Sequence, residues 1–198
     1  MMNLAILASH NGSILDYIYN SIQTNVLDIT VSVVITNNSN ALVIEKAKKY
    51  NIPYYVVNSK LYPDTNLDEK ILNILHSHNT EYILLAGYMK KIGDVIINSY
   101  QNKIINSHPA LLPKYGGVGM YGKFVHMEVL KNKEKISGVT IHYVNNHYDE
   151  GEIILQRSMR IAPHWDVDEL EANIKKLESD SVIQVLRQIA SYYYSKKS

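Results

Sequence analysis

Cysteine is absent from the 198 residues of this chain, which excludes disulfides, thiolate zinc sites and a catalytic thiol together. No segment approaches the roughly 18 consecutive apolar residues that would span a bilayer. The start, "MMNLAILASHNGS", has only a short apolar run with no basic region before it, unlike a secretory signal. These absences predict a soluble protein, and we expect it in the cytoplasm.

An excess of charge of one sign is also missing. The chain has 20 Lys and Arg against 19 Asp and Glu, a formal net charge of +1, and it has no long basic run. Binding of a nucleic acid depends on clustered cations that neutralise many phosphates. We therefore expect neither a nucleic-acid nor a membrane partner, whereas small molecules, phosphorylated ones included, fit this composition.

The length fits one domain, covering residues 1–198. Short unbroken apolar runs alternate with longer segments of 3.6-residue period, which is typical of parallel strands joined by crossover helices. The predicted strands are 4–9, 29–37, 54–58, 82–86 and 103–108, and the predicted helices are 13–25, 39–51, 67–78 and 91–100. Repeated crossovers predict an α/β fold, a Rossmann-like doubly wound and mostly parallel sheet flanked by helices.

The pattern changes after residue 109. Four of the nine glycines lie between Gly116 and Gly122, which predicts a mobile loop, and a helix is expected over 123–132. The runs 137–144 and 152–161 are joined by "NNHYDEG" and predict an antiparallel strand pair. A closing helix is expected from about residue 167 to 194.

The segment "ASHNGSIL" follows the first predicted strand and opens the first helix. Backbone N–H groups at such a helix N-terminus are unpaired and bind phosphate well, and Gly12 lets the backbone approach a ligand. Ser13 is available as an N-cap. The full G-x-G-x-x-G and P-loop patterns are missing, so an ordinary N-cap turn is the alternative.

Asn106 and His108 lie at the carboxyl end of a predicted parallel strand, where open α/β sheets bind their ligands. Two residues apart on an extended chain, they point to the same side. An amide that holds a carbonyl oxygen and an imidazole that handles protons suit acyl-type transfer. A structural histidine at a strand end is the alternative.

The other polar candidates are less specific. Asp149 lies near a glycine in the predicted turn "NNHYDEG". Aspartate is common in turns because its side chain hydrogen-bonds to the nearby backbone, so a structural role is the simplest interpretation. His142 alternates with Ile141 and Tyr143 on its strand, so a satisfied histidine on a partly buried strand is the simplest interpretation, and support of the site is the alternative. His76 and His78 are spaced i,i+2 on a predicted helix and do not share a face, so we assign no metal site.

The motifs together are far more specific. "NSHPALLPKYGG", followed after a helix by "GVTIHYVNNHYDEGEIILQ", resembles the formyltransferase family that uses 10-formyltetrahydrofolate. The resemblance covers nearly the whole chain, including the "NGS" loop and "LLAGYMKKI". It implies transfer of a formyl group from 10-formyltetrahydrofolate to the amino group of glycinamide ribonucleotide in purine biosynthesis, without a metal, a redox cofactor or a protein nucleophile.

The resemblance also implies catalytic roles. Asn106 would hold the formyl oxygen, and His108 as imidazolium would stabilise the oxyanion of the tetrahedral intermediate. Asp149 would orient His108 and assist proton transfer, with His142 in support. 

It implies binding roles as well. The loop of Asn11, Gly12 and Ser13 would take the 5′-phosphate of the acceptor, and Glu178 would contact its glycinamide end. The folate pocket would be lined by Met89, Lys90, Ile92 and Ile97, together with the backbone around Val144.

Some positions depart from the family pattern. Ile14 stands where Asn is frequent, Lys90 replaces a common Arg, Glu150 stands where many members have Gly, and the loop "GGVGMYG" differs from the "PGLHTH" type. These departures concern substrate detail rather than reaction class.

Several alternatives stay open at this point. The main ones are a sugar N-formyltransferase that uses the same donor and a catalytically inactive folate- or nucleotide-binding module. A methionyl-tRNA formyltransferase would need a further C-terminal domain, and a formyltetrahydrofolate hydrolase a further N-terminal one. The sequence allows either a monomer or a homodimer.

Overall fold

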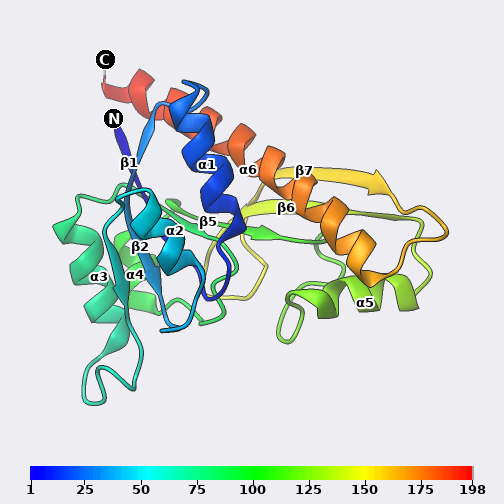
Figure 1. The fold of residues 1–198 in the computed structure, drawn as a ribbon, viewed down its shortest axis with the longest axis horizontal. Coiled ribbons are helices and arrows are strands. Elements are labelled where there is room, and N and C mark those ends of the chain that lie inside the picture. Colours follow the sequence, from blue (N-terminus) through cyan, green and yellow to red (C-terminus); the bar gives the residue numbers. More distant parts are fainter. Residues whose placement is uncertain (198) are drawn as a thin grey trace. The chain divides into compact units, whose positions relative to one another are not determined.

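The computed structural model describes residues 1–197 as an α/β protein in which strands and helices alternate (Figure 1). The strands are β1 (Met2–Leu7), β2 (Ile29–Thr36), β3 (Tyr54–Val56), β4 (Tyr82–Leu85), β5 (Ile104–His108), β6 (Ile136–Tyr143) and β7 (Ile153–Arg160). The helices are α1 (Ser13–Gln23), α2 (Val43–Lys49), α3 (Leu67–Ser77), α4 (Asp94–Ser99), α5 (Lys123–Lys131) and α6 (Val167–Lys197). Every strand and helix expected from the sequence is present.

The strand order in the sheet is β3-β2-β1-β4-β5-β6-β7. β1 pairs in parallel with β2 on one side and with β4 on the other, and β2 pairs in parallel with β3. β6 and β7 are antiparallel. The predicted doubly wound, mostly parallel sheet with an antiparallel strand pair in its C-terminal part is therefore confirmed. The strand order reverses between β1 and β4, and ligands bind outside the carboxyl ends of strands at such a switch point.

The described chain divides into two compact units. Unit 1 contains the chain up to Ile105 and from Leu186 onward, and unit 2 is Asn106–Val185. α6 contributes its first part to unit 2 and its last turns to unit 1. The expectation of a single domain stays a prediction. Among the described residues, none of the helices combines the length and the apolar character needed to cross a membrane.

Unit 1 owes its core to strands that are apolar on both faces. Five of the six residues of β1 are buried, because helices cover a parallel sheet on either side. α1 buries Ile14, Leu15 and Ile18, and α3 buries a matching stripe at i, i+3 and i+4. The backbone after β1 and after β4 is thereby fixed at the switch point.

Unit 2 is built on the long β6–β7 pair, drawn in yellow-green and yellow in Figure 1. The pairing runs from Ile136 opposite Arg160 to His142 opposite Ile153, and its register shifts between Ile141 and His142. Such bulges re-aim the side chains beside them. Here the bulge lies next to a histidine of the candidate site.

Two local expectations were wrong. Ser13 is the first helical residue of α1 rather than its N-cap: Gly12 occupies the cap with φ 55° and provides no side-chain hydrogen bond. α2 begins at Val43, later than the pattern predicted, because the Asn38 side chain accepts the Asn40 N–H and holds a turn there.

Candidate active site

Asn106 and His108 lie at the end of β5, and the alternation of the strand places them on one side, as predicted. His108 is buried, with 4% of its surface exposed. Its Nε2 lies 2.7 Å from the carbonyl oxygen of Tyr115. A carbonyl only accepts, so Nε2 carries the hydrogen and the neutral ring has its lone pair on Nδ1.

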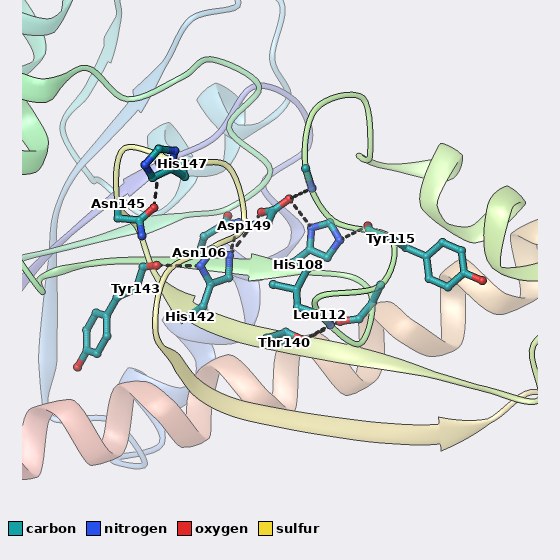
Figure 2. A network of polar contacts seen from close by, with 12 residues as sticks. Asn106, His108, Leu112, Tyr115, Thr140, His142, Tyr143, Asn145, His147 and Asp149 are labelled. Atoms are coloured by element: carbon teal, nitrogen blue, oxygen red, sulfur yellow. Dashed lines mark hydrogen bonds and ion pairs between the residues drawn. The ribbon is translucent and has the colours of Figure 1, made fainter.

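Asp149 faces that lone pair (Figure 2). Its Oδ2 lies 3.5 Å from Nδ1 of His108 and also accepts the Gly117 N–H at 2.8 Å. Asp149 lies in the β6–β7 connection with φ 57°, a left-handed conformation that Asp and Asn tolerate better than most residues. Asp149 therefore adopts a turn conformation and also places its carboxylate beside His108.

His142 contacts both the Asn106 amide and the Asp149 carboxylate. Its Nδ1 donates to its neighbour's carbonyl, Tyr143 O, at 2.8 Å, so the neutral ring presents an acceptor at Nε2. That atom lies 3.2 Å from Nδ2 of Asn106 and 3.5 Å from Oδ1 of Asp149. An amide NH₂ carries two hydrogens, so donation to His142 leaves the second one for a ligand oxygen.

Burial and charge oppose each other in this cluster. Burial lowers the pKa of His108, although the Asp149 carboxylate and the Tyr115 carbonyl act to raise it. Burial acts to raise the pKa of Asp149, but the contact with His142, the proximity of His108 and the Gly117 N–H outweigh it and leave that pKa lowered. Burial thus shifts His108 toward the neutral imidazole, beside an ionised Asp149 carboxylate. The imidazolium role that the resemblance implies stays a prediction.

A residue that the sequence did not single out fixes the chain after His108. Thr140 is fully buried on β6, and its hydroxyl donates to Ala110 O at 2.7 Å and accepts the Leu112 N–H at 3.1 Å. Nε2 of Gln156 donates to the same hydroxyl and to Leu112 O. The Thr140 hydroxyl thus uses its one hydrogen and both of its acceptor positions. These bonds hold the segment from Ala110 to Leu112, which leads to Tyr115.

Glu178 lies on α6, where residues 171, 175 and 178 share one face of the helix. Burial raises the pKa of its carboxyl, against the effects of the Ser107 hydroxyl and the Lys175 ammonium. Ser107 stands between the two candidate catalytic residues on β5. The structure therefore brings Glu178 close to the strand that carries Asn106 and His108.

The predicted phosphate loop begins four residues after β1, in unit 1. Gly12 has φ 55°, and a Cβ there would lie 2.4 Å from Cγ2 of Val43, so no other residue fits without strain. The first N–H groups of α1 have no partner inside the helix. Asn11 is exposed and Ser13 half-buried, whereas Ile14 packs into the core and offers a ligand only its backbone.

The predicted folate residues lie in two places. Met89 and Lys90 are exposed on the segment after β4, while Ile92 and Ile97 are buried with 4% and 8% of their surfaces exposed. Val144 follows β6 in unit 2 and is half-buried. No group of three or more His, Asp or Glu residues suited to a metal ion occurs within residues 1–197.

The comparisons with known proteins agree with this chemistry. The model of a family described as formyl transferase matches residues 2–186, and the chain belongs to that family. Phosphoribosylglycinamide formyltransferase of Bacillus subtilis is 34% identical, over 96% of this chain and 95% of its own length. The Haemophilus influenzae protein of the same name is 32% identical, over 90% and 82%. The crystal structure of glycinamide ribonucleotide transformylase 1 from Geobacillus kaustophilus has a TM-score of 0.87 and 33% identity, covering 96% and 98% of the two chains.

Proposed function

We propose that this chain transfers the formyl group of 10-formyltetrahydrofolate to the primary amine of glycinamide ribonucleotide, a step of purine biosynthesis. The observation that carries the proposal is the convergence of Asn106, His108 and Asp149 at the end of β5, with the His108 and Asp149 side chains 3.5 Å apart. The identity to phosphoribosylglycinamide formyltransferases over nearly the full length of the chain supports the choice of acceptor.

The reaction forms one carbon–nitrogen bond and breaks another. The substrate amine attacks the formyl carbon, and the N–H of Asn106 that His142 leaves over stabilises the oxygen as it becomes negative. The amine gives up a proton to the His108–Asp149 pair, where Nδ1 takes it and the carboxylate stabilises the imidazolium. Collapse of the tetrahedral adduct breaks the bond to N10 of the folate, and the proton ends on N10.

The binding roles extend the proposal. The phosphate of the acceptor binds the N–H groups at the start of α1, where the helix dipole favours an anion and the loop of Asn11, Gly12 and Ser13 offers donors. Glu178 accepts from the glycinamide end. Burial raises the pKa of Glu178, and a cationic amine bound beside it would lower that pKa and favour the ionised carboxylate.

The formyl donor is proposed to bind against the segment after β4, in unit 1. Met89 and Lys90 present an apolar and a cationic side chain at the surface, while Ile92 and Ile97 are buried apolar residues that follow them in the chain. The role of the Val144 backbone, in unit 2, stays a separate prediction. A pterin or benzoyl ring needs this kind of mainly apolar lining with few polar contacts.

The experiment is an acceptor comparison. The purified chain is incubated with 10-formyltetrahydrofolate and either glycinamide ribonucleotide or a nucleotide-linked amino sugar, and deformylation of the folate is followed by absorbance. We expect turnover only with glycinamide ribonucleotide. Turnover with the amino sugar alone would identify a sugar N-formyltransferase, and folate binding without turnover on any amine would identify an inactive binding module.

A further inference from the structure

Ser9 is a buried residue two positions after β1, with 2% of its surface exposed. Its hydroxyl has two partners on different segments: Oδ1 of Asn37, which follows β2, and the backbone N–H of Met89, which follows β4, at 2.7 Å. An N–H only donates, so the Ser9 oxygen accepts from Met89 and its hydrogen goes to Asn37. One hydroxyl thus ties together the carboxyl ends of three neighbouring strands.

The backbone of Ser9 makes separate contacts with the same segments. Its N–H donates to Gly87 O at 3.2 Å, and its carbonyl accepts from Nδ2 of Asn38 at 3.1 Å. These two bonds depend only on the main chain at position 9. They hold the chain just before the phosphate loop whatever side chain stands at position 9, whereas the bond to Met89 depends on the hydroxyl.

The segment from Gly87 to Gly93 is also held at its far end. The Gly93 N–H donates to Oδ1 of Asp68 at 3.2 Å, and a Cβ at position 93 would lie 2.3 Å from Oδ2 of the same carboxylate. Anchors at both ends leave Met89 and Lys90 exposed between them. The segment is therefore presented in a fixed conformation rather than as a free loop.

We propose that Ser9 is a positioning residue for the formyl donor: its hydroxyl sets the conformation of the segment 87–93 that receives the folate. This inference rests on the proposed function, because it assigns the folate to that segment. Fixing a loop in its binding conformation before the ligand arrives lowers the entropy cost of binding. Ser9 acts on donor binding through Met89, without touching the phosphate of the acceptor.

The test separates the two substrates. In Ser9→Ala the KM for 10-formyltetrahydrofolate should rise about three- to tenfold, the usual worth of one neutral hydrogen bond. The KM for glycinamide ribonucleotide should stay within about twofold of the parent, since the backbone bonds of position 9 remain. Ser32→Ala is the matched control. That hydroxyl also bridges two partners within unit 1, Leu4 O and Thr80 Oγ1, and its removal should shift neither KM.

Asn37 gives a second route if the serine variant folds poorly. Asn37→Leu removes the acceptor of the Ser9 hydroxyl and should raise the donor KM selectively, whereas Asn37→Asp keeps an acceptor oxygen and should restore the parental value. Equal shifts of both KM values, or a donor KM unchanged in Ser9→Ala and Asn37→Leu, would refute the proposal while the parent still turns over. A parent inactive on every amine would refute the proposed function instead.

Discussion

Oδ2 of Asp149 lies 3.5 Å from Nδ1 of His108, and the same oxygen accepts the Gly117 N–H. Two residues before Gly117, the Tyr115 carbonyl engages the other nitrogen of the same ring. A three-residue backbone segment thus contacts both members of the pair, as an acceptor to the histidine and as a donor to the carboxylate. The pair is oriented by main chain, and its chemistry depends on its own two side chains.

Asp149→Asn removes the charge from this pair and keeps its shape. Asn tolerates the positive φ of this position and can still accept from Gly117. We expect kcat to fall by about 10²–10⁴, as for a positioned acid–base group, with the free energy of unfolding lowered by no more than about 1.5 kcal/mol. Steady-state kinetics and thermal unfolding measure both, with Asp64→Asn, an exposed loop carboxylate, as the control. A kcat near that of the parent would remove Asp149 from the mechanism.

A negative charge at position 13 tests the phosphate site. Gly12→Val would be a poor test because its Cβ would meet Val43. Ser13→Glu places a carboxylate in the first turn of α1, where the helix dipole favours it by about 0.3–1 kcal/mol. We therefore expect unchanged or slightly higher thermal stability together with a clear rise in the KM for glycinamide ribonucleotide. Ser21→Glu, in the last turns of the same helix, should leave that KM alone. An unaltered KM in Ser13→Glu would exclude this phosphate site.

His126 predicts a loss of stability in acid. It is buried in α5 with 2% of its surface exposed, and its Nδ1 has no hydrogen-bond partner among the described residues. Burial lowers its pKa to about 4, below the ordinary value of 6.5. Below pH 6.5 the unfolded chain binds a proton that the folded chain refuses until about pH 4, so stability falls as pH falls through this window.

Between pH 7 and pH 5, His126 alone should lower the free energy of unfolding by about 2 kcal/mol. In urea unfolding, the free energy of unfolding of His126→Gln should fall less than that of the parent between these pH values, by this amount. His164→Gln, at an exposed position before α6, should behave like the parent. If His126→Gln loses as much stability as the parent, protonation of His126 is not a source of acid sensitivity.

Thr140→Val should reduce both stability and turnover. The variant keeps the shape of the side chain but leaves the buried Leu112 N–H and Ala110 carbonyl without their partner, which costs about 2–3 kcal/mol. Displacement of the segment that carries the Tyr115 carbonyl should lower kcat about 10- to 100-fold. ¹⁵N NMR at pH 8 should show the Nε2–H tautomer of His108 in the parent and a mixture in the variant. Thr140→Ser should keep the tautomer, and a Val variant with parental tautomer and kcat would contradict this role.

The sequence predicted most of the fold because its apolar pattern is simple. The run 82–86, for example, is short and has no charged residue, which is typical of a parallel strand covered on both sides. It also placed Asn106 and His108 at a strand end by alternation alone. Asp149 needed the family resemblance, since an aspartate in a turn has a sufficient local reason to be there.

The rest depends on contacts that have no sequence signal. The Tyr115 carbonyl and the Gly117 N–H are backbone groups, which any residue at those positions would provide. The bond from Met89 to Ser9 joins residues 80 positions apart, and only the strand order brings them together. The N-cap of α1 was misplaced for a local reason, because Gly12 adopts a conformation that a capping serine does not.

The last turns of α6 belong to unit 1, and this determines when the first unit can be completed during synthesis. The Met2 N–H donates to the Tyr194 hydroxyl, 192 residues later in the chain, and that hydroxyl donates in turn to Asp28 O. A ribosome delivers the strands of unit 1 early but delivers the last turns of α6 only after all of unit 2 has been synthesised. The nascent first unit therefore waits for nearly all of the chain to be translated before its full set of contacts can form.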